Sequence, residues 1–128
     1  MDAAQALADL TEISSQIEAA VLFDEAGVVH GATLADERAA AELARGAAEL
    51  LEHAGRFRSG GAITQLEAAT DSGSVFVVRD GARRIAATTP PQPTVGLVFY
   101  DLKSALRQAG PEAEQPTRTN RQKTDDEA

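Results

Sequence analysis

The chain of 128 residues contains no cysteine, no tryptophan and only five aromatic residues. Without cysteine, disulfide scaffolds, thiolate metal sites and thiol nucleophiles are excluded. Basic residues are also scarce, because 12 Lys and Arg stand against 20 Asp and Glu, for a net charge of −8. Nucleic-acid binding is therefore not expected, since it requires an excess of basic side chains to neutralise phosphates.

Long hydrophobic runs are missing as well. The longest uninterrupted one is Ala19 to Phe23, whereas a membrane-spanning helix needs about 18 apolar residues. The first five residues are acidic rather than basic and no apolar stretch follows them, so they do not resemble a secretory signal. We expect a cytoplasmic protein with no membrane insertion.

Large apolar side chains make up a small share of the chain. Hydrophobic residues account for 43% of it, but 26 of them are Ala and only 27 are Leu, Ile, Val or Phe. None of these 27 lies beyond Leu106. Residues 110–128 therefore have nothing large to bury, and their composition is typical of disorder. The sequence predicts one folded domain over residues 1–109 and a disordered tail over 110–128.

The first third of the chain predicts a helix followed by a hairpin. Apolar residues recur at helical spacing over residues 3–18, including Ile13. Bulky β-branched segments at 20–23 and 28–33 flank an acidic, glycine-containing turn, as in a hairpin. Gly31 inside the second segment indicates a bulge or a close approach by another backbone.

Residues 37–57 predict a long helix with one charged and one very wide apolar side. The apolar arc covers about 200°, roughly twice the width that packing on one sheet requires. We expect Leu43, Leu50 and Phe57 to face the sheet, which leaves the alanines on the remaining apolar side. Either those alanines are simply exposed, or a second subunit covers them.

Three further segments, 63–70, 74–79 and 83–88, predict strands joined by tight turns. The next segment, 95–109, begins with strand-like composition, but its length and period favour a helix. The order is thus helix, two strands, helix, three strands, helix. It predicts an α+β fold, with a five-stranded antiparallel sheet and helices on both faces.

This pattern resembles the roadblock/dynein light-chain domain family. The resemblance rests on the acidic turn and glycine of Asp24 to Val29, the Ala- and Leu-rich helix from Ala39 to Phe57, and the closing segment from Val95 to Leu102. It covers residues 5–108 and contains no catalytic signature.

The resemblance implies a profilin-like fold and a homodimer formed through the long second helix and the adjoining third strand. It also implies a partner, because bacterial members of the family bind small Ras-like GTPases. Carried onto this chain, the dimer contact would use the small and apolar side of that helix and the strand beside it: Ala40, Ala41, Ala44, Ala48, Leu51, Ile63, Gln65 and Glu67.

A search for chemistry finds no catalytic, cofactor or metal site. There is no phosphate-binding glycine loop ending in Lys-Ser or Lys-Thr. His30 and His53 lack carboxylates at ligand spacing on their own elements, so structural roles are favoured for both. Asp24 belongs to a turn, where aspartate commonly hydrogen-bonds the backbone. The Arg83–Arg84 doublet is interpreted first as a solvated turn and second as a contact for an anionic partner.

The charged side of the long helix allows two interpretations. An i, i+3/i+4 ladder of charges is first a solvated face worth a few tenths of a kcal/mol per pair. It can also specify a partner by charge pattern. The candidate partner-binding residues are Arg38, Glu42, Arg45 and Glu49.

The leading hypothesis is a non-catalytic homodimeric module that binds and regulates a small Ras-like GTPase as an activator or scaffold. A small-molecule sensor or adaptor of profilin-like fold is the alternative. With only five aromatic residues in the chain, a large pocket lined by aromatic side chains is not expected. A small hydrolase is a third possibility, and the sequence offers no clustered acid/base pair for it.

Overall fold

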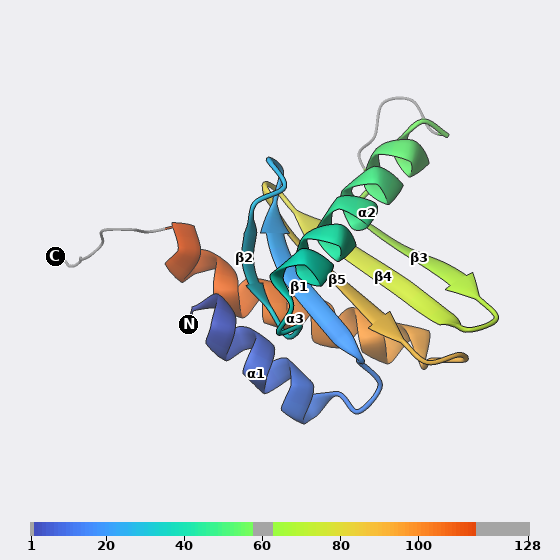
Figure 1. Ribbon diagram of the computed structural model, residues 1–128, viewed down its shortest axis with the longest axis horizontal. Helices are drawn as coiled ribbons and strands as arrows, with labels where there is room; N and C mark the ends of the chain where they lie inside the picture. Colours follow the sequence, from blue (N-terminus) through green and yellow to red (C-terminus); the bar gives the residue numbers. More distant parts are fainter. Residues whose placement is uncertain (1, 58–62, 115–128) are drawn as a thin grey trace, which may run out of the picture.

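The computed structural model describes residues 2–57 and 63–114, with side chains up to Ala109. Its elements follow the predicted order (Figure 1). They are α1 (Ala3–Ile13), β1 (Ala19–Asp24), β2 (Val29–Ala32), α2 (Glu37–Gly55), β3 (Gln65–Thr70), β4 (Gly73–Asp80), β5 (Arg83–Thr89) and α3 (Val95–Glu114).

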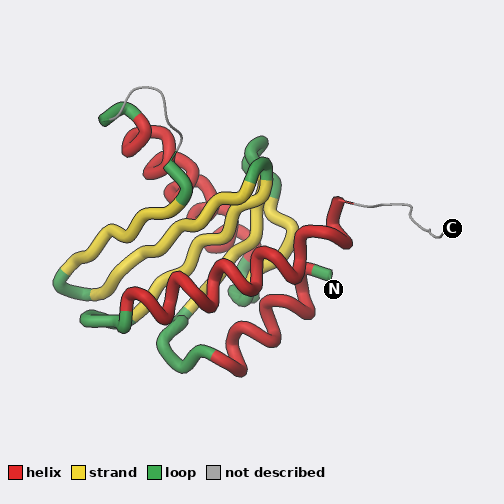
Figure 2. Tube along the Cα trace, turned by 180° about the vertical axis from the view of Figure 1, so that it is seen from behind, coloured by secondary structure: helices red, strands yellow, loops and turns green. Residues whose placement is uncertain are grey.

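The five strands form one antiparallel sheet in the order β2-β1-β5-β4-β3. Helices α1 and α3 lie side by side on one face, and α2 crosses the other face alone (Figures 1 and 2). The predicted α+β architecture, with helices on both faces of a five-stranded sheet, is confirmed. Within the described part of the chain, no helix is long and apolar enough to cross a membrane.

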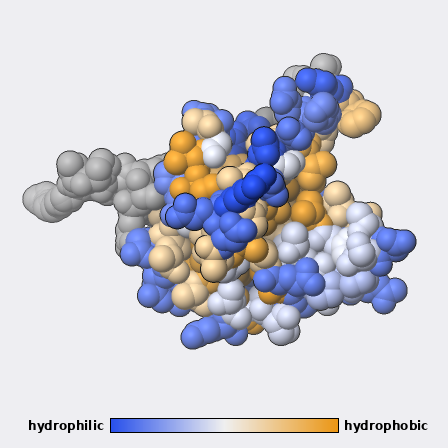
Figure 3. Space-filling view, in the orientation of Figure 1, coloured by the Kyte–Doolittle hydropathy of each residue, from blue (hydrophilic) through white to orange (hydrophobic). Residues whose placement is uncertain are grey.

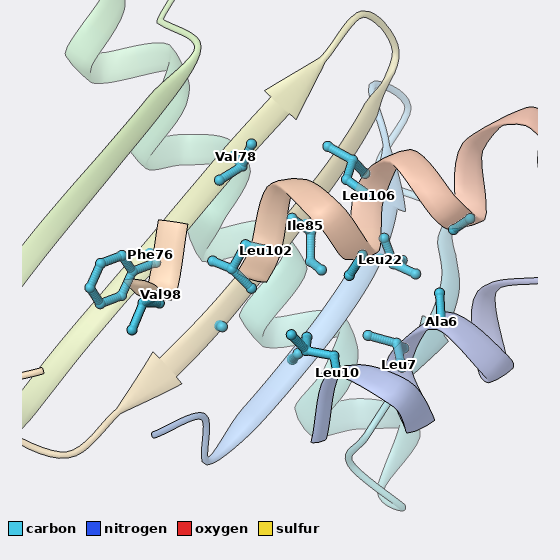
Figure 4. Packing of buried hydrophobic residues seen from close by; sticks show 14 residues of the cluster. Ala6, Leu7, Leu10, Leu22, Phe76, Val78, Ile85, Val98, Leu102 and Leu106 are labelled. Atoms are coloured by element: carbon cyan, nitrogen blue, oxygen red, sulfur yellow. The ribbon is translucent and has the colours of Figure 1, made fainter. Parts of the chain in front are cut away.

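The larger of two core clusters lies between the sheet and the α1/α3 layer (Figure 4). Leu102 and Leu106 of α3 are completely or almost completely buried there against Ile85 of β5. The rings of Phe76 and Phe99 meet edge to face, with centroids 5.0 Å apart, a favoured geometry for aromatic pairs. This cluster holds nine of the thirteen buried Leu, Ile, Val and Phe side chains.

The smaller cluster lies between α2 and the other face of the sheet. Here Val21, Phe23 and Val77 of the sheet are buried under a helix face made largely of alanine. Because an alanine side chain is a single methyl group, α2 approaches the strands closely, and the strands supply the bulk of this core.

Gly31 of β2 shows why glycine stands inside a strand. A Cβ atom at this position would lie 3.1 Å from Ala3 Cβ and 3.3 Å from Leu7 Cδ1 of α1. The pairing of β1 with β2 also shifts register between Leu22 and Phe23. The predicted close approach is therefore present, and the helix that makes it is α1.

Two helix boundaries differ from the prediction. Helix α1 ends at Ile13 rather than residue 18, because Ser14 adopts an extended conformation after its N–H bonds to the Leu10 carbonyl. Ile13 is 70% exposed, so its placement on the buried face was wrong. Helix α3 continues to Glu114, five residues beyond the expected end of the domain. The remainder of the predicted tail lies outside the described residues.

Candidate partner-binding surface

Helix α2 begins at a capped N-terminus that fixes its position on the sheet. The Asp36 carboxylate accepts a hydrogen bond from the Arg38 backbone N–H at 2.9 Å, which satisfies one of the free amides of the first turn. The four candidate partner-binding residues form an exposed row along the outer side of this helix, facing away from the sheet: Arg38, Glu42, Arg45 and Glu49.

Ion pairing along this row is weak. The Arg38 Nε and Glu42 Oε2 atoms are 3.8 Å apart, and both side chains are more than half exposed. At the C-terminal end of the helix, the C-cap residue Arg56 pairs with Glu52 at 3.3 Å, again in solvent. Exposed pairs of this kind contribute about 0.2–1 kcal/mol. The row is therefore a solvated face whose charges are available to another protein.

The sheet-facing side of α2 was predicted wrongly. The buried residues are Ala40, Ala44, Ala47 and Leu51, whereas Phe57 is 85% exposed. Leu43 and Leu50 are only half-buried. The sheet beneath α2 already carries Phe23 and three other buried side chains, so three of the four buried positions of α2 are alanines, and Leu43 and Leu50 pack beside them. Three of the residues predicted to contact a second subunit, Ala40, Ala44 and Leu51, are covered by the chain's own sheet.

The two flanks of α2 face different strands. Ala41 and Ala48 lie on the flank toward the β1–β2 hairpin, where they line hollows shared with Gly27 and Glu25 respectively. Helical geometry places Leu43 and Leu50 on the opposite flank, toward β4 and β3. Figures 1 and 3 show α2 packed over β1, β2 and β5, with its charged outer side exposed.

Half-buried apolar side chains run from this second flank to the edge of the sheet. Leu43 of α2, Ile63 before β3, Leu66 of β3 and Val75 of β4 all pack against the smaller core cluster without being enclosed by it. We call these four residues the apolar strip. Ile63 packs against the same cluster as Leu43. Leu66 was missed because its strand alternates too weakly to mark a face.

Strand β3 forms one edge of the sheet. It pairs with β4 on one side, from Gln65 opposite Val78 to Thr70 opposite Gly73. No other described strand pairs with its second side. The exposed residues Gln65 and Glu67 lie on this edge strand, and Glu67 Oε2 accepts a hydrogen bond from Ser74 Oγ at 3.0 Å. An unpaired edge can accept a further strand.

The turn between β1 and β2 contains a contact that spacing alone did not reveal. The Asp24 carboxylate accepts hydrogen bonds from the backbone N–H groups of Ala26 and Val28, and its Oδ2 lies 2.8 Å from His30 Nε2. Those contacts, His30 first, lower the pKa of Asp24 below its ordinary value of 3.8. Spacing along one element could not reveal this contact, because the hairpin brings the side chains of Asp24 and His30 together across neighbouring strands.

A small cavity lies near this contact, on the α1/α3 side. It measures about 180 Å³, and its lining includes Ala3, Leu22, Leu106 and Ala109 together with Asp24 and Arg83. Small-molecule sites usually enclose about 300–1,000 Å³, so its size does not favour the sensor alternative. Among the side chains of 2–57 and 63–109, no three His, Cys, Asp or Glu are grouped to hold a metal ion.

Known structures share this arrangement of sheet and helices. No family model and no curated protein matches the sequence. A roadblock/LC7 domain from Streptomyces avermitilis superposes with a TM-score of 0.78 at 22% identity, covering 88% of this chain and 98% of that one. The chain has the roadblock/LC7 fold.

Two further structures with this roadblock fold belong to MglB proteins. The gliding protein MglB from Thermus thermophilus gives a TM-score of 0.68 at 15% identity, with 88% of this chain and 89% of that chain covered. An MglB with a tetrameric arrangement gives 0.70 at 14% identity, with 90% of each chain covered. In the roadblock fold of this chain, the charged row, the apolar strip and the β3 edge all belong to the layer formed by α2 and the sheet edge.

Proposed function

We propose that this chain is a non-catalytic homodimeric module that binds and regulates a small Ras-like GTPase. The observation that carries the proposal is the apolar strip beside an unpaired β3 edge, both lying next to a helix whose outer side is charged. The resemblance to the roadblock/dynein light-chain family supports the choice of partner, and the roadblock fold is consistent with it.

The dimer would form where the apolar strip is incompletely covered. Two copies placed edge to edge would pair their β3 strands, and each α2 would cover part of the other copy's strip through Leu43. This arrangement removes an edge that would otherwise invite uncontrolled pairing. It also covers apolar surface, and each Å² of such surface removed from water contributes about 25 cal/mol. The tetrameric arrangement of one MglB relative supports self-association.

Of the interface residues predicted from the sequence, Ala41, Ala48, Ile63, Gln65 and Glu67 remain exposed or half-buried. Ile63, Gln65 and Glu67 lie at or beside the proposed contact. Ala41 and Ala48 lie on the flank toward the β1–β2 hairpin, so we propose that they stay outside it.

The charged row of α2 would then provide the surface for the GTPase. Arg38, Glu42, Arg45 and Glu49 carry both signs and are exposed, so they can impose a charge pattern on the partner at low desolvation cost. Regulation by such a module would act by positioning groups of the GTPase itself.

The decisive experiment mixes the purified full chain with the small Ras-like GTPase encoded nearest to it in its genome. We expect co-elution, together with a change in GTP hydrolysis or nucleotide exchange. The double variant Arg45→Glu/Glu49→Lys reverses two of the four charges of the row and keeps the net charge. It is expected to weaken binding of the GTPase about tenfold, equivalent to about 1.4 kcal/mol.

A matched control exchanges two exposed charges on the opposite face of the sheet, in Glu12→Lys/Arg107→Glu. This variant has the same net charge and is expected to bind the GTPase as the unmodified chain does. No co-elution with unchanged hydrolysis and exchange would refute the proposed partner. Equal weakening by both double variants would refute the assignment of the charged row.

A further inference from the structure

A groove runs between α1 and α3, on the face of the sheet opposite α2. The two helices lie side by side there (Figure 2), and the groove measures about 210 Å³. Its apolar walls include Ala6, Leu10 and Ile13 of α1 and Ala105 of α3. Small-molecule sites usually enclose about 300–1,000 Å³, so the space suits one long side chain better than a whole metabolite. We call it the α1/α3 groove.

Asp101 of α3 lines this groove and has no partner in the folded chain. Only 7% of the residue is exposed. Among the described residues, no group donates a hydrogen bond to its carboxylate, and no basic side chain forms an ion pair with it. Neither carboxylate oxygen is fully enclosed, so the charge remains open to the groove. Because an unpaired charge held this far from water destabilises a fold, a cation in the groove would relieve that cost.

A second carboxylate gives the groove a clear sign of charge. Asp9 of α1 lines it together with Asp101, and Asp9 Oδ1 accepts one hydrogen bond, from Gln5 Nε2 at 2.9 Å. Within the described parts of α1 and α3, no Lys, Arg or His lines the groove. Arg107 donates instead to Ser104 Oγ at 3.3 Å. The groove is therefore negative, and the ligand that complements it is a cation.

The other lining residues indicate which cation fits. Ala6, Leu10 and Ala105 offer an apolar wall, along which a long basic side chain can lay its methylene groups while its charged end meets the carboxylates. Tyr100 also lines the groove and is largely exposed, so its ring is open for a guanidinium to stack on. Arginine is preferred to lysine in such places, because its planar group presents five donors and is weakly hydrated.

Exposed apolar side chains beside the carboxylates indicate that this arginine belongs to a protein. Ile13 and Tyr100 both line the groove, and more than half of each is exposed. Leu97, which precedes Tyr100 by one helical turn, is half exposed. A free amine in the groove would leave these side chains in water, whereas a protein surface around an inserted arginine would cover them.

We propose that the α1/α3 groove binds an arginine side chain of a protein partner. Asp101 and Asp9 would hold the guanidinium, and Ile13 and Tyr100 would pack against apolar residues next to that arginine. The charged row and the apolar strip belong to the opposite layer, so a partner in the groove leaves both free. The chain would then join two proteins, one on each face of its sheet. The inference does not depend on the proposed GTPase or on the dimer.

The test titrates the ¹⁵N-labelled full chain with the peptide acetyl-Leu-Arg-Leu-amide and follows the backbone amide signals by nuclear magnetic resonance. Signals of residues that line the groove are expected to shift until they saturate, whereas those of Arg45 and Glu49 on α2 should not move. The same peptide with citrulline in place of arginine keeps the shape and loses the charge. It is expected to bind about tenfold more weakly, because hydrogen bonds between two ions are stronger than those to a neutral group.

Two substitutions separate the role of Asp101 from a general effect of charge. Asp101→Asn is expected to weaken binding of the arginine peptide about tenfold. It should leave the urea midpoint of unfolding unchanged or raise it, because the carboxylate has no contact in the free chain to lose. Glu12→Gln is the matched control, since Glu12 is exposed on α1 and does not line the groove. Its affinity for the peptide should stay within about twofold of that of the unmodified chain.

The proposal would be overturned by an arginine peptide that causes no shifts in the groove, by equal affinities of the arginine and citrulline peptides, or by equal weakening in both variants. A lower urea midpoint of Asp101→Asn would also count against it, since it would show a structural role for the carboxylate. Agmatine carries the same guanidinium without flanking apolar residues and is expected to bind more weakly than the peptide. Equal or tighter binding of agmatine would identify a free amine as the ligand and overturn the protein partner.

Discussion

Single residues in this chain gain their roles from neighbours on other strands. Asp24 could be assigned to a turn from the sequence, because aspartate before a glycine-containing turn commonly accepts backbone hydrogen bonds. Its contact with His30 could not be assigned, since the pairing register of two strands decides which side chains meet. The pairing of Arg79 in β4 with Arg84 in β5 was hidden for the same reason: the doublet Arg83–Arg84 is visible in the sequence, but the partner across the ladder is not.

At this scale we predict that Asp24→Asn lowers the free energy of unfolding by about 1 kcal/mol at pH 7, the usual contribution of a charge-assisted turn contact. The pKa of Asp24 is lowered in the folded chain from its ordinary value of 3.8. The ionised carboxylate therefore stabilises the fold at every pH above 3.8. That contribution is lost as the pH falls below 3.8 and the carboxylate protonates. Urea unfolding should therefore show a smaller difference in the free energy of unfolding between the variant and the unmodified chain at pH 3 than at pH 7.

The neighbouring Glu25→Gln is the matched control for this prediction. Glu25 is exposed in the same turn, and its substitution should change stability by less than about 0.5 kcal/mol at either pH. A deficit for Asp24→Asn that persists undiminished at pH 3 would show that the amide harms the turn by geometry rather than by charge.

At the scale of elements, helix and strand periods recovered the order and type of every described element. They did not predict which side of α2 faces the sheet. In an alanine-rich helix, the buried side and an exposed apolar side have almost the same hydrophobicity. The larger Leu43, Leu50 and Phe57 drew the prediction to one side. What decided the orientation was the shape of the sheet below, where Phe23 and Val77 leave room for methyl groups at three of the four buried positions of α2. That shape depends on residues far away in the sequence.

A substitution on each side of α2 tests this orientation. Ala44 is 1% exposed, and Ala44→Leu should lower the free energy of unfolding by about 1–3 kcal/mol, because three extra carbons must fit between the helix and the sheet. Ala41 is exposed, and Ala41→Leu should be nearly neutral, since Ala and Leu have similar helix propensities. Chemical denaturation of both variants measures the difference. Equal stabilities would show that α2 does not approach the sheet through its alanines.

At the scale of the whole molecule, the few large apolar side chains are distributed unevenly between the two faces of the sheet. The α1/α3 layer encloses most of the large side chains that are buried, whereas the α2 layer is built on alanine and leaves the apolar strip half-covered beside an open edge. From the width of the helix stripe, the sequence allowed either exposed alanines or a second surface, and we propose that such a surface lies at the flank of Leu43 and at Leu66. In the proposed dimer, a second copy would cover this strip and so stabilise the domain.

The dimer can be tested by placing one charge in the apolar strip, at Leu66 of β3, and another on the opposite flank of α2, at Ala41. We expect the unmodified chain to sediment at twice its mass of 13.4 kDa and Leu66→Arg to sediment as a monomer, because a guanidinium would have to be desolvated inside the proposed contact. Ala41→Arg introduces the same charge on the flank toward the β1–β2 hairpin and should remain dimeric. Far-UV circular dichroism should show unchanged helix content in both variants.

Thermal unfolding gives an independent measure of the same association. Binding that favours the folded state adds about 2.7 kcal/mol when the protein concentration is 100 times the Kd, so the melting temperature of the unmodified chain should rise with concentration and that of Leu66→Arg should not. An unmodified chain that stays monomeric and melts at one temperature across this range would exclude the dimer. The half-covered strip would then be available to a partner in every copy.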